Sequence, residues 1–343
     1  MGTVLRKVSS MPRPWYVLSF SLVTLACDDT ATEPGTAPSD RSPVMAVASN
    51  TWRSRANMPS DRRFVITATV NPGSGGSFLY AIGGQSMNST DFCSGSLSKV
   101  QAYDGNSNTW SSKAPLPIPV LRSLAGVING KIYVAGGCNG PNRPLNTLYV
   151  YDVAANRWSG KALPPMSLPS PVGAVVGGKL YVYDDCSFDA CDVDTTATTR
   201  LEQVTFFGFY DPATNRWTRL PLPPLFPIAG ASFNDKLYFL DSNGQVHIYN
   251  PGTRAWTTGA LRSGSIQGLR TTAPAGSKWY LVGSTFLSVY DPATNAWAER
   301  AAPPAAYIAD NSNGPTAGRV VVGGIGRLEL VGGAAPHNWQ YTP

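Results

Sequence analysis

The sequence has few of the side chains on which most enzyme active sites depend. It contains two histidines, His247 and His337, in 343 residues, so no Ser/His/Asp arrangement can be assigned. Its five cysteines include no Cys-x-x-Cys spacing, which argues against a zinc site. No glycine-rich loop leads from a strand into a helix to hold a phosphate. Catalysis by these common routes is therefore not expected.

Charged residues are also scarce, and they form no basic patch. Asp, Glu, Lys and Arg make up 14% of the chain, and the formal net charge is +6. Arg6, Lys7 and Arg13 lie in a segment expected to be removed, so +6 falls to +3 in the processed chain. Without a run rich in Lys or Arg, the sequence gives no support for nucleic-acid binding.

The N-terminus has the features of an export signal. The three cations precede an uncharged run, residues 15–26, that is too short to span a bilayer as a helix. We expect residues 1–26 to be a cleaved signal peptide, with Met11 as an alternative start. The sequence TLAC at residues 24–27 resembles a bacterial lipobox, which implies lipidation of Cys27, although Thr24 stands where Leu is usual. Plain cleavage after Ala26 is the alternative.

Residues 27–50 contain no aromatic side chain and are rich in Thr, Pro, Asp and Ser. Such a segment buries too little apolar surface to fold, so it is predicted to be a disordered tether. A tether suits a globular domain held by acyl chains on Cys27. We expect a monomer in the bacterial cell envelope that is lipid-anchored and has no other membrane contact, or alternatively a secreted or periplasmic soluble protein.

The remaining chain is an internal repeat. Seven tryptophans close short strand-like stretches, and five of them follow a Tyr by seven residues: Tyr103 to Trp110, Tyr151 to Trp158, Tyr210 to Trp217, Tyr249 to Trp256 and Tyr290 to Trp297. Trp52 and Trp339 are the other two. Ahead of each Tyr lies a short apolar run, at residues 78–84, 131–137, 179–185, 236–242 and 278–284, with a weak sixth copy at 319–324.

These runs are rich in β-branched and aromatic residues and follow hairpin-turn dipeptides, so each unit is predicted to contain four antiparallel strands. A four-stranded unit cannot bury both of its faces alone, whereas radial repetition lets each sheet cover its neighbour. The predicted fold is all-β, a six-bladed β-propeller over residues 51–343. Small inner-strand residues would line the axis, and the Trp and Tyr rings would lie between blades.

The Gly-Gly pair followed by Tyr-Asp-Pro-x-x-Asn-x-Trp resembles the Kelch repeat. Residues 210–217 (YDPATNRW) and 290–297 (YDPATNAW) match that pattern almost fully. The resemblance covers nearly all of residues 51–343 and implies a Kelch-type propeller. The third and fourth units lose the glycine pair, the fifth loses half of it, and the last has Gly332 where Tyr is expected before Trp339. The sequence does not decide whether the segment from Asn50 or the tail from Trp339 completes the last sheet. Pairing of both chain ends in one blade would protect the sheet edges.

Four cysteines remain after Cys27. All follow the apolar runs of the first three units, on loops between second and third strands. We predict a Cys186–Cys191 disulfide within one loop and a Cys93–Cys138 disulfide between neighbouring blades.

Carboxylates gather on the same loops. Asp184 and Asp185 replace a glycine pair, three more aspartates follow by residue 194, and Asp241 takes the matching place in the next unit. They are interpreted either as solvated turn residues or as ligands for Ca²⁺, although the spacing lacks the glycine and the terminal Glu of an EF-hand loop.

Arginines are predicted at the mouth of the channel. Counting back from the apolar runs places Arg63, Arg122, Arg270 and Asp310 near the starts of innermost strands. In Kelch domains that bind partners, arginines at similar places line the channel mouth, so the resemblance implies this role for the three arginines. Converging guanidinium groups favour carboxylates, phosphates or acidic peptides. Pairing with carboxylates such as Asp310 is the alternative.

We therefore expect a protein or glycan ligand on the long-loop face, with no cofactor and no catalysis. One alternative is a carbohydrate-active enzyme at the channel mouth. A sugar mutarotase or epimerase would use Asp310, Asp184, Asp185 or Asp241 with Arg270. A galactose-oxidase-like copper enzyme would need two histidine ligands, and His247 and His337 are not expected to meet. A purely structural domain is the other alternative.

Overall fold

The computed structural model describes residues 50–71, 76–89, 93–140, 143–185, 204–304, 316–322, 325–331 and 338–343. All of them belong to one compact unit, Val47–Pro343. The predicted signal peptide, Cys27 and all but the last residue of the predicted tether lie outside the described residues. None of the described segments forms a helix long and apolar enough to cross a membrane.

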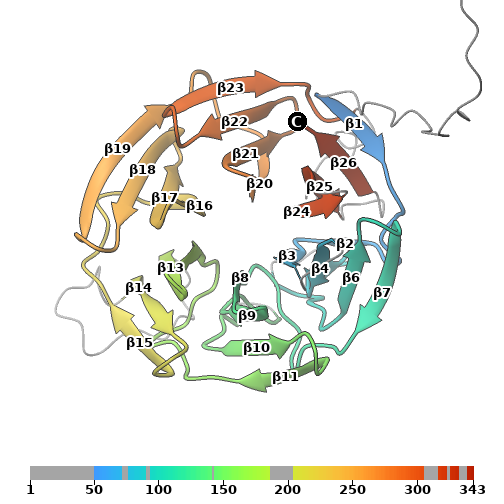
Figure 1. The fold of residues 1–343 in the computed structure, drawn as a ribbon. Coiled ribbons are helices and arrows are strands. Elements are labelled where there is room, and N and C mark those ends of the chain that lie inside the picture. Colours follow the sequence, from blue (N-terminus) through green and yellow to red (C-terminus); the bar gives the residue numbers. More distant parts are fainter. Residues whose placement is uncertain are drawn as a thin grey trace, which may run out of the picture. The chain divides into compact units, whose positions relative to one another are not determined.

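The predicted six-bladed propeller is confirmed: six four-stranded antiparallel sheets surround a central channel (Figure 1). We number the blades I to VI, and each list runs from the innermost strand outward. Blade I contains β3 (Ile66–Val70), β4 (Phe78–Ile82), β6 (Val100–Asp104) and β7 (Thr109–Lys113). Blade II contains β8 (Leu124–Ile128), β9 (Lys131–Ala135), β10 (Leu148–Asp152) and β11 (Arg157–Gly160). Blade III contains β12 (Val172–Val176), β13 (Lys179–Asp185), β14 (Thr205–Asp211) and β15 (Arg216–Arg219).

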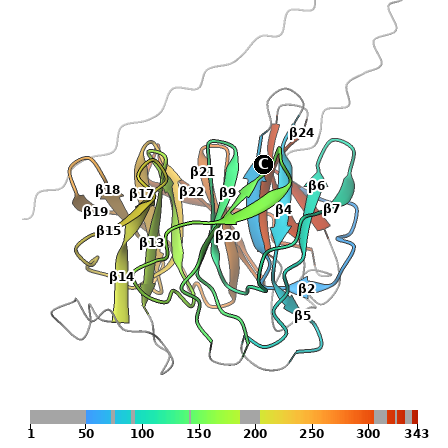
Figure 2. The ribbon, with the colours of Figure 1, turned by 90° about the horizontal axis from the view of Figure 1, so that it is seen from below.

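The second half of the ring follows the same order. Blade IV contains β16 (Pro227–Phe233), β17 (Lys236–Asp241), β18 (Gln245–Asn250) and β19 (Ala255–Leu261). Blade V contains β20 (Leu269–Ala275), β21 (Lys278–Gly283), β22 (Leu287–Asp291) and β23 (Ala296–Arg300). Blade VI contains β24 (Thr316–Val322), β25 (Ile325–Val331), β26 (Asn338–Thr342) and β1 (Thr51–Ser54). A short ribbon of β2 (Arg62–Arg63) and β5 (Gln85–Ser86) lies at one end of the ring (Figure 2).

Small residues let the innermost strands approach the axis closely. A Cβ atom on Gly230 of blade IV would lie 2.9 Å from backbone atoms of Gly173 in blade III, closer than real Cβ contacts. The second strands carry the apolar runs, and their side chains fill the space between blades as separate buried clusters. The sequence pattern of small, then apolar, then Tyr-containing strands therefore corresponds to the order from axis to rim.

A repeated hydrogen-bonded clasp explains the Tyr, Asn and Trp of the motif. In blade II the Tyr151 hydroxyl donates to Asn156 Oδ1 at 2.5 Å, and the same oxygen accepts the backbone N–H of Ala114, which follows the outer strand of blade I, at 2.9 Å. Trp158 Nε1 donates to the carbonyl of that alanine at 2.9 Å. Asn156 has a φ of 49°, a conformation that asparagine tolerates better than most residues. One asparagine thus ties its own blade to the preceding one.

The clasp recurs at four further blade junctions. The Tyr, Asn, Trp and Ala sets are Tyr103, Asn108, Trp110 and Ala56; Tyr210, Asn215, Trp217 and Ala162; Tyr290, Asn295, Trp297 and Ala260; and Tyr341, Asn50, Trp52 and Ala301. The tyrosines are fully buried, whereas the tryptophans are only partly buried and cover them from the rim, so the wedge between blades is made chiefly by Tyr.

Blade IV departs from this pattern for a chemical reason. The residue that would supply the N–H group from blade III is Pro221, which has none, and Arg254 replaces the asparagine. Arg254 keeps the left-handed backbone, with a φ of 58°. This junction relies on aromatic packing instead, including Phe207 against Trp256 at 5.6 Å between ring centroids.

The two ends of the chain close the ring by pairing in blade VI, which settles the question left open by the sequence. β1 pairs with β26, with Trp52 opposite Tyr341, and their rings lie 5.1 Å apart (Figure 1). The sequence-based assignment of this last unit is wrong by one strand. The valine run at residues 319–324 belongs mostly to β24, which lies between β20 and β3 at the channel, and is not a second strand. The Tyr of the unit is Tyr341, and its rim Trp is Trp52 and not Trp339.

Candidate functional site

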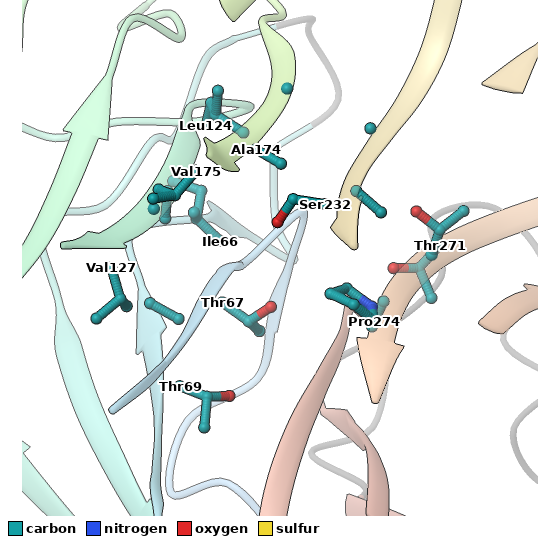
Figure 3. Close-up of a pocket in the computed structure, with 18 of the residues that line it drawn as sticks. Ile66, Thr67, Thr69, Leu124, Val127, Ala174, Val175, Ser232, Thr271 and Pro274 are labelled. Carbon is teal, nitrogen blue, oxygen red and sulfur yellow. The ribbon is translucent and has the colours of Figure 1, made fainter. Parts of the chain in front are cut away.

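The innermost strands enclose an axial cavity of about 710 Å³. Its lining comes from β3, β8, β12, β16 and β20, which agrees with the predicted small residues around the axis. Hydroxyl groups of Thr67, Thr69, Ser232 and Thr271 lie among apolar side chains such as Ile66 (Figure 3). The described lining includes two arginines and no carboxylate. The described lining therefore mixes hydroxyl and apolar groups, and its charge comes from the two arginines at its mouth.

The innermost strands begin, and the second strands finish, at one end of the ring. We call this end the mouth face. Arg122 and Phe64 hold equivalent places there, each two residues before its innermost strand, and both line the cavity. Their φ angles are 59° and 52°, unfavourable for side chains of this kind. The Arg122 guanidinium carbon lies 4.8 Å from the centre of the Phe64 ring. Burial lowers the pKa of Arg122. Backbone strain of this kind concentrates at functional sites.

Arg270 lies across the mouth on blade V, at the entrance to a neighbouring hollow of about 400 Å³. Ile228 of blade IV lines both this hollow and the axial cavity, and 43% of its surface is exposed. The adjacent Phe226 is 62% exposed. They are two of the four large hydrophobic residues that are exposed among those the structure describes. The mouth thus combines cations with accessible apolar groups.

Arg63, the third predicted arginine, does not line the cavity. Its Nε donates to Gln85 Oε1 at 2.8 Å, and its Nη2 donates to the carbonyl of Ser89. Its guanidinium carbon still lies 5.9 Å from the centre of the Phe64 ring. Arg63 and Arg122 therefore meet around one phenylalanine, while Arg270 lies on the other side of the opening.

The Cys93–Cys138 disulfide joins the loops of blades I and II beneath Phe64, and this predicted pairing is confirmed. Both cysteines are buried, with Cα atoms 5.6 Å apart. Cys138 also exchanges backbone hydrogen bonds with Leu121, next to Arg122, at 2.8 and 3.0 Å. The disulfide therefore fixes the loop that carries Arg122.

The carboxylates have structural contacts. Asp184 continues strand β13 and is 2% exposed, so its interpretation as a solvated turn residue is wrong. Its Oδ2 accepts the Ser170 N–H at 2.8 Å, and burial raises its pKa well above the usual value. Asp185 ends the strand, is exposed, and has its pKa raised by partial burial.

Asp241 caps the hairpin between β17 and β18. It accepts backbone N–H groups of Asn243 and Gln245 and lies 3.0 Å from His247 Nε2. Partial burial works to raise its pKa, but these hydrogen bonds, that of His247 foremost, leave it below the usual value. Asp184, Asp185 and Asp241 do not line the axial cavity.

Several predicted site residues, namely Cys27, Cys186, Cys191 and Asp310, lie outside the described residues. Within the described ranges, no group of three or more His, Cys, Asp or Glu side chains gathers closely enough to hold a metal ion. The Ca²⁺ interpretation rested mainly on residues 184–194, most of which are outside those ranges.

Comparison with known proteins identifies the repeat. A model of the Kelch motif matches residues 120–162, which contain all four strands of blade II. Blade II therefore carries a Kelch motif, and this chain resembles Kelch-repeat proteins. Human Kelch-like protein 33 is 33% identical to it over 70 residues, which are 20% of this chain and 12% of that protein. Kelch-like protein terF of Aspergillus terreus is 36% identical over 80 residues, 23% of this chain and 16% of that one.

A solved structure shares the overall fold over most of this chain. The solved structure of YjhT superposes with a TM-score of 0.58, at 14% identity, and covers 81% of this chain and 92% of that one. Such a likeness shows the fold. The matches to Kelch-like protein 33 and terF span less than a fifth of the length of either relative.

Sequence reasoning missed Phe64, Phe226 and Ile228 at the mouth. Phe64 could have been found by the same counting that placed Arg122, because it stands one residue after Arg63. No pattern distinguishes Phe226 and Ile228 from core residues, since both follow the proline-rich connection to blade IV.

Proposed function

We propose that this Kelch propeller is exported, is tethered to the cell envelope through a lipid on Cys27, and binds a protein or glycan ligand at the mouth face without catalysis. The supporting observation is the mouth itself. Arg122 and Arg270 flank a cavity lined by hydroxyl and apolar groups, and Phe226 and Ile228 remain exposed at the same face. Exposed aromatic and arginine side chains are the residue types that most often carry binding energy at interfaces.

The arrangement favours recognition over chemistry. The described cavity lining offers no carboxylate or histidine as a general base, and Asp241 is already engaged by His247. Arg122 stacks on Phe64, and both are held by a strained backbone and the nearby disulfide. A preorganised arginine loses little freedom on binding, which improves affinity.

The test uses the processed chain, residues 27–343 with Cys27→Ser, on a glycan array and on immobilised envelope proteins, with and without Ca²⁺. We expect binding by the unaltered mouth and its loss in the double variant R122Q/R270Q. The matched control is R53Q/R216Q, which removes the same charge from exposed positions on β1 and β15. Equal binding by all three proteins would refute a ligand site at the mouth.

The tether is tested separately in the bacterium. We expect the full chain to incorporate labelled palmitate and to fractionate with membranes, and Cys27→Ser to abolish both. Membrane association that survives Cys27→Ser would overturn the lipid anchor while leaving the mouth proposal intact.

A further inference from the structure

Blade II has a second hollow, of about 410 Å³, on its outer strands β9, β10 and β11. Its volume lies in the range of roughly 300–1,000 Å³ that is usual for small-molecule sites. Lys131, Asp152 and Arg157 form one cross-strand row at the end of the blade remote from the mouth face. No lining residue is shared with the axial cavity. This hollow is therefore distinct from the mouth.

The hollow carries uncompensated positive charge. Three cations, Lys131, Arg157 and Lys161, line it with one carboxylate, Asp152. Lys131 Nζ lies 2.6 Å from Asp152 Oδ2, and this hydrogen bond, with one from the Ala155 N–H, lowers the pKa of Asp152. In the part of the chain that the structure describes, the side chains of Arg157 and Lys161 have no hydrogen bond or ion pair. Two cations are thus available to an anion.

Aromatic and hydroxyl groups complete the lining. Tyr133 lies beside the cations, and Ser159, opposite Val150, is in the next row on the same face of the blade. Trp158 is in the row between and points to the other face, where its indole belongs to the clasp with blade I. A phenol ring next to polar groups suits a ligand that has both an apolar face and hydroxyl groups. A sugar ring has this combination, and its hydroxyls could bond to Asp152 and Ser159.

Blade III shows what distinguishes this hollow. Its matching row is Lys179, Asp211 and Arg216, but the place of Val150 is taken by Phe209. Lys179 Nζ lies 4.6 Å from the centre of the Phe209 ring. Arg219 donates to the Thr205 carbonyl at 2.9 Å. There the Phe209 ring lies against Lys179, whereas the smaller Val150 leaves space at the same place on blade II.

We propose that the blade II hollow binds an acidic sugar residue of a polyanionic glycan. Arg157 and Lys161 hold the carboxylate or sulfate, Tyr133 faces the apolar side of the sugar ring, and Asp152 accepts hydrogen bonds from its hydroxyls. Fork-like hydrogen bonds from Arg157 match a carboxylate well. The site is additional to the ligand proposed at the mouth.

The test measures binding of trigalacturonate to the processed chain by calorimetry, with its methyl ester as an uncharged control. We expect R157Q/K161Q to weaken binding by about tenfold or more, the loss expected for charge-assisted contacts. The charge-matched control R53Q/R216Q should change it by less than about twofold, because neither of those cations lines the hollow. The methyl ester should not bind.

Two more variants distinguish binding in this hollow from non-specific electrostatic binding and from binding at the mouth. V150F copies blade III, fills the hollow without changing charge, and should abolish binding while the melting temperature shows a folded protein. R122Q/R270Q should bind trigalacturonate normally, so failure here and failure of the mouth proposal are distinguishable. If a sulfated disaccharide binds instead of trigalacturonate, and the same variants weaken its binding, the proposal is supported and the bound anion is a sulfate group.

Three results would overturn it: equal losses in R157Q/K161Q and R53Q/R216Q, unchanged affinity in V150F, or equal binding of hexaglutamate, which would indicate an acidic peptide.

Discussion

Glu329 should make the stability of this propeller fall as the pH rises. It lies on β25, fully buried between the closing strands, where Gln340 Nε2 donates to its Oε1. Its other oxygen has no hydrogen-bond partner within the described residues. Burial raises the pKa of Glu329 from 4.5 to about 8, and the Gln340 hydrogen bond and the charges of Arg55 and Arg327 only partly oppose this.

The sign and size follow from proton linkage. Because the folded pKa is above the unfolded one, the contribution of the neutral carboxyl is fully present below pH 4.5. It is lost as the pH rises through 8. A difference of about 3.5 pH units at about 1.4 kcal/mol each amounts to about 5 kcal/mol of unfolding free energy. Most of this change should fall between pH 5 and pH 8.

The perturbation is Glu329→Gln, which is neutral at every pH and keeps an oxygen to accept from Gln340. Urea unfolding of the disulfide-intact domain, at intervals from pH 5 to pH 9, compares the variant with the unaltered chain. We expect similar midpoints at pH 5 and a much higher midpoint for the variant at pH 9. Parallel curves for the two proteins would refute the argument, since Glu329 would then titrate alike in both states.

Further predictions concern the clasps and the disulfide. The double variant P221A/R254N should supply the missing clasp between blades III and IV and raise the unfolding free energy by about 1 kcal/mol through its hydrogen bonds. R254N alone should not, and a double-mutant cycle of melting temperatures would show the difference. Asn50→Ala should cost roughly 1–3 kcal/mol in denaturant unfolding, because the Tyr341 hydroxyl and the Ala301 N–H both lose their acceptor. The double variant C93S/C138S should lose about 4 kcal/mol from a loop closed over a separation of 45 residues, and an unchanged unfolding midpoint would contradict that.

The blade count could be predicted because five of the six blades repeat the same set of hydrogen bonds. A buried Tyr hydroxyl and an alanine N–H require an acceptor, and Asn156 and its counterparts supply it at a fixed spacing from Trp. The last blade could not be assigned by the same pattern. Its Tyr341 and Trp52 are at opposite ends of the chain, and a valine run fits an innermost strand as well as a second strand.

The site was only partly predictable. Counting along the repeat placed Arg122 and Arg270 at the channel, because strand lengths vary little between blades. The same counting could not show that hydrogen bonds to Gln85 and Ser89 hold Arg63 outside the cavity lining, or that Asp184 continues a strand. Both features depend on contacts specific to one blade.

The central claim, a ligand site at the mouth face, is tested most directly by a photo-crosslinking amino acid placed at single positions in the native envelope. Phe226 and Ile228 are the mouth positions, and the exposed hairpin residue Asn129, at the opposite end of blade II, is the control. We predict a discrete crosslinked product from the two mouth positions that disappears with R122Q/R270Q, and no such arginine-dependent product from Asn129. Products of equal yield from all three positions, or products indifferent to the arginines, would contradict it.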